Sequence, residues 1–364
     1  MTGAREVLLV GSVPLAPAAV VFETVARHLN EFAPRIPDGE QIGWSRAARR
    51  TIERHDAFEV SGQIYMNAGG VDPADLFRLK KGLSSKDVAL GPYGYAENAI
   101  DSYTAFKKLR DDGVIAASTR YQMTLPGPGT SVFYIQMPAE DLLPLAREAL
   151  LNEIERTLLS IPASDLTIQI DAGMEAEHEE YLRRPQAFDQ PAHKAFHWTM
   201  EQMAESVAWL ANHIPAEVEL GFHICSIWHH DPSAGQDNQV LVDVANAIIS
   251  RVRRPVGYVH IPIIPEHAAE DFQPLKELEL RGAKLYLGLI NFADGLEGAR
   301  KRMTLAETVV SDFGVASFCG LGRPATLNVR PTQFHRHSPI AALRRATPET
   351  IDTVLDLHRS VALA

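Results

Sequence analysis

Short apolar runs rich in β-branched residues alternate along the chain with longer stretches whose apolar positions recur about every 3.6 residues. The short runs predict eight strands, at residues 7–10, 58–66, 114–124, 166–170, 218–225, 256–261, 284–290 and 313–318. The longer stretches predict helices at residues 18–29, 99–111, 139–159, 194–213, 239–251, 296–311 and 347–363. This alternation predicts an α/β protein built as a (β/α)8 TIM barrel, with a doubly wound open sheet as the alternative.

Nothing in the sequence divides the chain into parts. Its 364 residues contain no tandem repeat, no low-complexity tract and no clear linker. No glycine-rich dinucleotide-binding motif follows any predicted strand. Although this length would also allow two ordinary domains, the sequence predicts a single barrel domain over residues 1–364.

Composition limits the partners and the compartment. The net charge of −11 argues against nucleic acid and against an anionic membrane surface, because both require a basic patch. Two cysteines in a chain of this length do not make a disulfide scaffold and are expected as free thiols in a reducing, cytoplasmic compartment. We see no signal peptide and no apolar run near the ~18 residues that a membrane span needs.

Polar residues recur where the predicted strands end. They are Ser12, Asp171, His223, Cys225, His260, Asn291 and Cys319. Active sites of (β/α)8 barrels form at the carboxyl ends of the strands, and a barrel core needs no such residues there. The recurrence therefore predicts that these side chains form one site.

His223 and Cys225 end the strand predicted at residues 218–225. Residues i and i+2 of a strand project to the same face, so one imidazole and one thiol are expected to point the same way. Cys319 follows the last predicted strand and would bring a second thiol to the same end. Three nitrogen and sulfur ligands with an open position form a catalytic zinc site, so Zn²⁺ is the predicted cofactor. The alternative is a buried histidine and two inert core thiols.

Several further residues are candidates for the same site, each with a structural alternative. Asp171 is expected to contact the substrate or to make a structural hydrogen bond. His260 is expected to bind the metal or to be a satisfied core histidine. Trp228 and His229 follow the zinc pair, where they would line the pocket, with His229 as a general acid or base, or lie in a polar loop.

Loops and helix faces add weaker candidates. Asp38 and Glu40 would bring carboxylates over the barrel mouth or simply form a turn. The segment 333–337 would bind an anionic group or be a solvated loop. The segment 125–130 is expected to be a rigid turn, although its glycines would also allow a ligand to approach closely. The charged helix face at residues 175–184 is expected to be solvated.

Four short motifs, in order along the chain, carry a resemblance to a known family. They are Val10–Pro14, Ile168–Asp171, His223–Cys225 and Cys319–Arg323. With these motifs the chain resembles the catalytic barrel of cobalamin-independent methionine synthase, in the superfamily that also holds uroporphyrinogen decarboxylase-like enzymes. The ordered set is more specific than any single member.

The resemblance implies a barrel whose zinc binds a thiol and lowers its pKa, so that a thiolate attacks an alkyl group. It implies His223, Cys225 and Cys319 as zinc ligands, and Asp171 at a position that helps to hold the amino group of homocysteine. We expect the catalytic residues to be Asp171, His229 and His260. We expect the substrate-binding residues to be Ser12, Asp38, Glu40, Asp171, Trp228 and Asn291.

The chain also departs from the family. Asp171 is followed by Ala172 where methionine synthases have glutamate, and His260 stands where they place a zinc-binding carboxylate. The fourth zinc ligand is therefore left open among His260, Glu266 and the substrate. Residues 67–71 show no clear folate-site motif, and the chain has no room for the usual N-terminal duplicate.

The sequence thus predicts a zinc-dependent methyl or alkyl transferase that acts on a small-molecule thiol and departs from a standard folate- and homocysteine-dependent methionine synthase. Methyltetrahydrofolate and a methyl-corrinoid are the donors to consider. One alternative is a zinc-dependent lyase or hydrolase, with His229 or His260 as base. Others are a metal-free decarboxylase-like barrel, and a binding or corrinoid-partner protein without turnover.

Overall fold

The computed structural model describes residues 3–65, 73–185, 198–225, 237–263, 268–322 and 346–364. One parallel sheet of eight strands runs in the order β1-β10-β9-β8-β7-β6-β5-β2. Its strands are β1 (Val7–Leu8), β2 (Arg35–Pro37), β5 (Arg120–Pro126), β6 (Leu166–Ala172), β7 (Glu219–Ile224), β8 (Tyr258–Pro262), β9 (Lys284–Ile290) and β10 (Gly314–Ser317).

The two ends of this sheet meet. Ser12, after β1, forms a parallel bridge with Gly39, after β2. Val13 N donates to Gly39 O at 3.4 Å, and at the other end of the seam Val7 N donates to Phe32 O at 2.8 Å. The sheet is therefore a nearly closed (β/α)8 barrel, which confirms the predicted fold class and excludes the open sheet.

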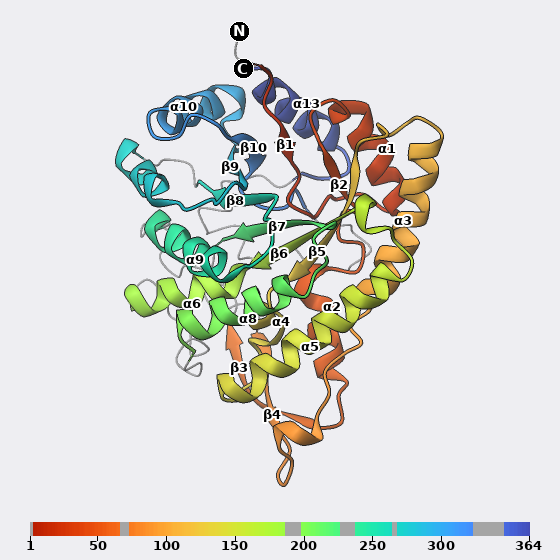
Figure 1. The fold of residues 1–364 in the computed structure, drawn as a ribbon, viewed down its shortest axis with the longest axis vertical. Helices are drawn as coiled ribbons and strands as arrows, with labels where there is room; N and C mark the ends of the chain where they lie inside the picture. The colour runs from red at the N-terminus through yellow and green to blue at the C-terminus, as the bar shows by residue number, and fades with distance from the viewer. Residues whose placement is uncertain (1–2, 66–72, 186–197, 226–236, 264–267, 323–345) are drawn as a thin grey trace.

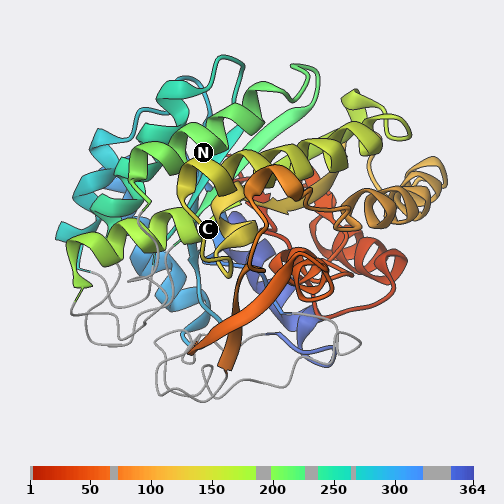
Figure 2. The ribbon, with the colours of Figure 1, turned by 90° about the horizontal axis from the view of Figure 1, so that it is seen from below.

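A ring of helices surrounds the barrel (Figures 1 and 2). Each member contacts the next, and the last contacts the first. In order they are α1 (Ala18–Leu29), α3 (Tyr95–Asp111), α5 (Ala139–Leu158), α8 (Met200–Asn212), α9 (Asn238–Arg251), the 3-10 helix η5 (Ala269–Glu277), α10 (Gly295–Glu307) and α13 (Ile351–Ala362). Their apolar faces pack on the sheet, as where Phe22 of α1 meets Tyr121 of β5 edge to face, with ring centroids 6.2 Å apart. None of the described helices has the length and apolar character to cross a membrane.

Shorter helices follow three strands at the carboxyl end of the barrel, which we call the mouth. They are α2 (Trp44–Glu53), α4 (Pro128–Val132) and α6 (Gly173–Arg183), and α4 contacts both of the others. The remaining 3-10 turns are η1 (Ser85–Asp87) and η2 (Ala163–Asp165). The segment 125–130, expected to be a turn, instead ends β5 and begins α4.

One predicted barrel strand is wrong. The run at residues 58–66 forms β3 (Phe58–Tyr65), which pairs only with β4 (Pro73–Leu79) in an antiparallel hairpin outside the barrel. Figure 1 shows this hairpin at the end of the molecule opposite the chain termini. The true second strand is β2, which has only three residues and ends in Pro37, so it leaves no alternating pattern to detect.

The barrel interior is polar along its axis. Gln169 Nε2 donates to Val10 O at 2.6 Å and to Asp171 Oδ1 at 2.8 Å, while Tyr258 Oη donates to Gln169 Oε1 at 2.9 Å. Toward the amino ends of the strands, the guanidinium group of Arg35 binds both carboxylate oxygens of Glu219, at 2.7 and 2.9 Å. These contacts fill the barrel interior toward the amino ends of the strands. The mouth is therefore the candidate position for a ligand.

Candidate functional site

Three polar residues lie side by side on neighbouring strands at the mouth. Asp171 on β6 pairs with His223 on β7, and His223 pairs with His260 on β8. Their exposed fractions are 5%, 1% and 0%. Gln169, two residues before Asp171 and on the same face, reaches across the barrel to Val10, so this face of the sheet is the interior.

His223 and His260 contact each other directly. Their Nδ1 atoms are 2.7 Å apart, and their ring centroids are 4.8 Å apart. The Nε2 atom of His223 is buried and has no hydrogen-bond partner among the described residues, whereas the His260 ring also lies against the backbone of Ser317. Burial is the largest cause that holds the pKa of His260 well below its usual value, and the neighbouring His223 ring acts in the same direction, against a smaller opposite effect of a hydrogen bond with the Ser317 backbone. His260 is therefore a neutral imidazole.

The chain's two cysteines meet at the mouth. Cys225 directly follows β7 and is buried, and Cys319 follows β10 and is partly exposed. A hydrogen bond with Cys319 is the largest cause that raises the pKa of the Cys225 thiol well above its usual value, and burial is the second. The negative charges of Asp171 and Glu177 act in the same direction. Without a cation beside it, Cys225 therefore stays a protonated thiol.

A second acidic group lies beside Asp171. Burial, and then the charge of Glu40, raise the pKa of the Asp171 carboxyl group well above its usual value. Glu40 has a positive φ of 58°, which is uncommon for a residue with a side chain. A Cβ atom at Gly11 would lie 2.4 Å from Glu40 Oε1, so the glycine after β1 leaves room for this carboxylate. Glu40 and Asp171 form a carboxyl pair.

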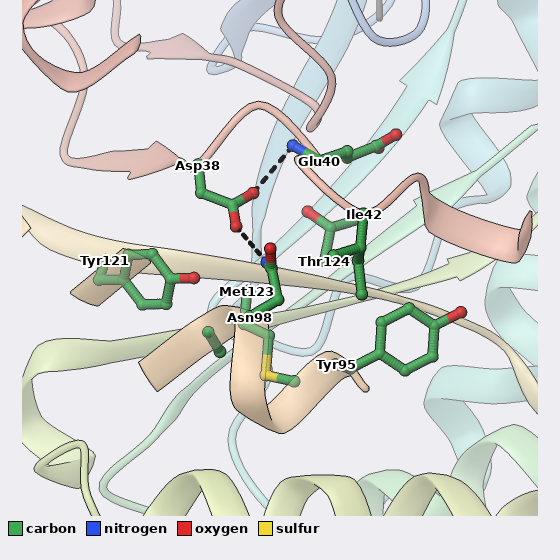
Figure 3. Close-up of a pocket in the computed structure, with 9 residues that line it drawn as sticks. Asp38, Glu40, Ile42, Tyr95, Asn98, Tyr121, Met123 and Thr124 are labelled. Atoms are coloured by element: carbon green, nitrogen blue, oxygen red, sulfur yellow. Dashed lines mark hydrogen bonds between the residues drawn. The ribbon is translucent and has the colours of Figure 1, made fainter. Parts of the chain in front are cut away.

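Asp38 holds the turn that carries Glu40 (Figure 3). Its carboxylate accepts hydrogen bonds from Glu40 N at 2.8 Å, Asn98 Nδ2 at 2.6 Å and Ser102 Oγ at 3.0 Å. Burial nevertheless raises the pKa of Asp38 above its usual value. A cavity of ≈ 20 Å³ beside it, bordered also by Thr124, has room for about one water molecule. Asp38 therefore supports the turn that carries Glu40.

Of the other residues predicted for the site, the structure describes Ser12 and Asn291. A Cβ atom at Gly320 would lie 2.1 Å from Ser12 Oγ, so Ser12 packs against the loop that carries Cys319. Asn291 follows β9, and its Oδ1 accepts a hydrogen bond from Ala293 N at 3.0 Å. Trp228, His229, Glu266 and the segment 333–337 lie outside the described residues.

The helix face at residues 175–184 was expected to be solvated, and this prediction is wrong. Glu175, Glu177 and Glu180 are at most 1% exposed. Glu175 accepts hydrogen bonds from Gly129 N at 2.9 Å and from Thr130 Oγ1 at 2.6 Å, which holds α4 against α6. Burial, and then the charge of Glu180, raise the pKa of Glu177 well above its usual value.

A signal for these buried glutamates exists in the chain. Helix α6 begins at Gly173, immediately after β6 ends at Ala172. With no loop between them, the first turns of the helix lie over the mouth, where barrels form their sites. A helix that starts directly after a strand-end aspartate is therefore a sequence signal for acidic groups buried at the mouth.

The donor chemistry at the mouth fits zinc in kind. Two thiols in contact, and a buried imidazole nitrogen without a partner, are the ligand types that zinc prefers. Among the described residues, however, no three His, Cys, Asp or Glu side chains stand in an arrangement that could hold a metal ion. A zinc site made of Cys225, Cys319 and His223 would require the imidazole of His223 to approach the two thiols.

Known proteins resemble this chain in fold alone. No protein-family model and no curated protein sequence matches it. A solved structure that does match is a B12-independent methionine synthase from Shewanella sp. W3-18-1 in complex with selenomethionine, with a TM-score of 0.53 and 12% sequence identity. The match covers 100% of this chain and 97% of that one. At this identity the likeness shows a similar barrel fold and no more.

Proposed function

We propose that this protein is a zinc-dependent alkyltransferase that transfers a methyl group to the sulfur of a small thiol. The observation that carries the proposal is the contact between Cys225 and Cys319 at the mouth of the barrel. These are the chain's only cysteines, and they come from the ends of two strands far apart in sequence. A buried imidazole, His223, lies two residues before one of them.

Cys225, Cys319 and His223 would hold the zinc, which when bound lowers the pKa of an acceptor thiol and so supplies a nucleophile near neutral pH. The protein's own part is to bury and orient the reacting groups. Ser12 packs behind the loop of Cys319, and Glu177 lies close enough to affect the Cys225 thiol. The negative charge around the thiol pair favours a cation over an anion at this position.

The carboxyl pair of Glu40 and Asp171 would bind a cationic amino group on the acceptor. Without a ligand, burial and Glu40 raise the pKa of Asp171 well above its usual value, which favours a proton on the pair. An ammonium group between the two carboxylates would take the place of that proton. The acceptor class we propose is therefore a small thiol that carries an amino group.

The matched methionine synthase supports this proposal in one respect. The match covers 100% of this chain and 97% of the methionine synthase chain, so the likeness in fold extends over nearly all of both chains. The methyl donor we propose is methyltetrahydrofolate or a methyl-corrinoid.

Zinc content of the full chain is the first test, measured beside Cys225→Ser and Cys319→Ser. We expect about one zinc per chain in the wild type and loss of zinc in both variants, because each removes one of three ligands. His358→Phe is the matched control, since His358 is also fully buried but lies on α13, outside the barrel. No zinc in wild-type protein prepared without chelator would refute the proposal.

The acceptor class is tested by turnover. Methylcobalamin and methyltetrahydrofolate are supplied as donors, with homocysteine and the same thiol lacking its amino group as acceptors. We expect the wild type to prefer homocysteine and Asp171→Asn to lose most of that preference, because the amide no longer pairs with the ammonium group. Equal rates with both acceptors in the wild type would contradict the role of the carboxyl pair.

A further inference from the structure

The contact between His223 and His260 limits which ring nitrogens are available to bind a metal ion. A neutral imidazole has one N–H donor and one bare nitrogen. A hydrogen bond between the two Nδ1 atoms at 2.7 Å therefore needs one ring to donate and the other to accept. The ring that donates through Nδ1 has a bare Nε2, and the ring that accepts carries its proton on Nε2.

Only one ring of such a pair can present a lone pair outside the pair. A metal-binding histidine must offer a bare nitrogen. His223 is the ring two residues from Cys225 on the same strand face. If His223 is the ligand, its Nδ1 carries the proton and points at His260, and its unpartnered Nε2 is free for the metal.

A single zinc shared by both rings does not agree with this contact. Two nitrogens bound to one tetrahedral zinc at ~2.05 Å are separated by roughly 3.3 Å. The two Nδ1 atoms are 2.7 Å apart, which is a hydrogen-bond distance. A zinc ion bound to both Nδ1 atoms would therefore require this hydrogen bond to break.

We propose that His260 is a positioning residue for His223: its Nδ1 accepts the Nδ1–H of His223 and so fixes the tautomer that exposes the Nε2 lone pair of His223. His260 thus replaces the carboxylate or carbonyl that commonly orients a metal-binding histidine. His260 is buried, in sheet register with His223, and close to the backbone of Ser317. The inference rests on the proposed function for the zinc, but the tautomers themselves do not depend on it.

Metal binding tests the role of His260 in the full chain. Zinc affinity is measured by competition with a chelating dye for the wild type, His260→Phe and His260→Asn. We expect His260→Phe to keep about one zinc per chain but bind it ~10–100-fold more weakly, as for other lost orienting partners. His260→Asn should recover part of that loss, because its side-chain oxygen can accept the same hydrogen bond. His358→Phe, a buried histidine away from the mouth, should bind zinc as the wild type does.

X-ray absorption of the zinc-loaded protein distinguishes positioning from ligation. We expect one imidazole and two sulfurs around the metal in both wild type and His260→Phe. Two imidazoles in the wild type, falling to one in His260→Phe, would overturn the inference and make His260 the fourth ligand.

The metal-free protein gives an independent measurement. Nitrogen-15 NMR of histidine-labelled protein, assigned with His260→Asn and His223→Asn, shows which ring nitrogens carry protons. We expect a protonated Nδ1 on His223 and a protonated Nε2 on His260. The reverse pattern would overturn the inference even if zinc binds, whereas this pattern in a protein that binds no zinc would leave the pair intact and refute only the proposed function.

Discussion

At the scale of single residues, the mouth depends on places where a side chain is missing. Gly11 leaves room for the carboxylate of Glu40, and Gly320 leaves room for the hydroxyl of Ser12. Deeper in the barrel, a Cβ atom at Gly221 would lie 2.0 Å from the ring of Tyr258. The shape of the candidate site therefore depends on these glycines as well as on the side chains for which they leave room.

Gly11→Ala should separate stability from function. The new Cβ atom would meet the flexible end of Glu40 at 2.4 Å, so we expect the carboxylate to turn away from Asp171 at a stability cost under about 1 kcal/mol. The proposed transfer to an amino thiol should fall roughly tenfold in kcat/KM, equivalent to about 1.4 kcal/mol. Urea unfolding and steady-state kinetics measure the two effects.

Gly62→Ala is the matched control, since a Cβ atom there meets nothing within 4 Å. It should leave both stability and kinetics near the wild type. A Gly11→Ala protein with unchanged kcat/KM would show that Glu40 does not contribute to the site.

At the scale of elements, helices α4 and α6 are joined by one buried carboxylate. Glu175 of α6 accepts hydrogen bonds from the backbone and side chain of Thr130 and from Gly129 N at the start of α4. The carboxylate stands at the amino end of α4, where the first N–H groups of a helix need partners. This contact keeps the two helices together above Asp171.

Glu175→Gln should destabilise the protein by about 1–3 kcal/mol, because an amide nitrogen, which cannot accept a hydrogen bond, then replaces one of the two acceptor oxygens. Denaturant unfolding monitored by circular dichroism measures the change. Glu201→Gln is the control, since that side chain is 82% exposed and should change stability by less than about 0.5 kcal/mol. Equal effects of the two substitutions would contradict the bridging role of Glu175.

Elements with a long, regular pattern could be predicted from the sequence. Helix α1 has the predicted bounds of residues 18–29, and strand β9 has the predicted bounds of residues 284–290. Strand β2 could not be predicted, because it is held by neighbouring strands and not by its own pattern. The same is true of the candidate site. The polar residues at the strand ends made Cys225 and Cys319 candidates, but no spacing in the sequence gives the 2.7 Å contact between the Nδ1 atoms of His223 and His260 on separate strands.

At the scale of the whole molecule, the base of the barrel is closed by a buried ion pair. Arg35 binds Glu219 through two nitrogens, and Arg35 Nη1 donates to Tyr286 Oη at 3.1 Å. The guanidinium group also lies 4.4 Å from the centre of the Tyr258 ring. One end of the barrel is thus filled by charge and aromatic rings, and the other end is the candidate site.

A double-mutant cycle measures the coupling free energy between Arg35 and Glu219 at the base of the barrel. Glu219→Gln alone should cost about 3–5 kcal/mol, because it leaves the Arg35 charge buried without its partner. Arg35→Met combined with Glu219→Gln should cost clearly less than the sum of the single variants. Urea unfolding supplies the free energies, and strict additivity would show that the pair is not coupled.

The pairing of β1 with β10 determines when the barrel can close during synthesis on the ribosome. Val7 and Leu8 lie beside Val315 and Ala316, so the first strand has no neighbour on that side until the last strand has been synthesised. Cys319 follows that last strand, and its thiol cannot reach Cys225 any earlier. The thiol pair can therefore form only after the last strand has been synthesised, and a metal that needs both thiols could bind only from that point on.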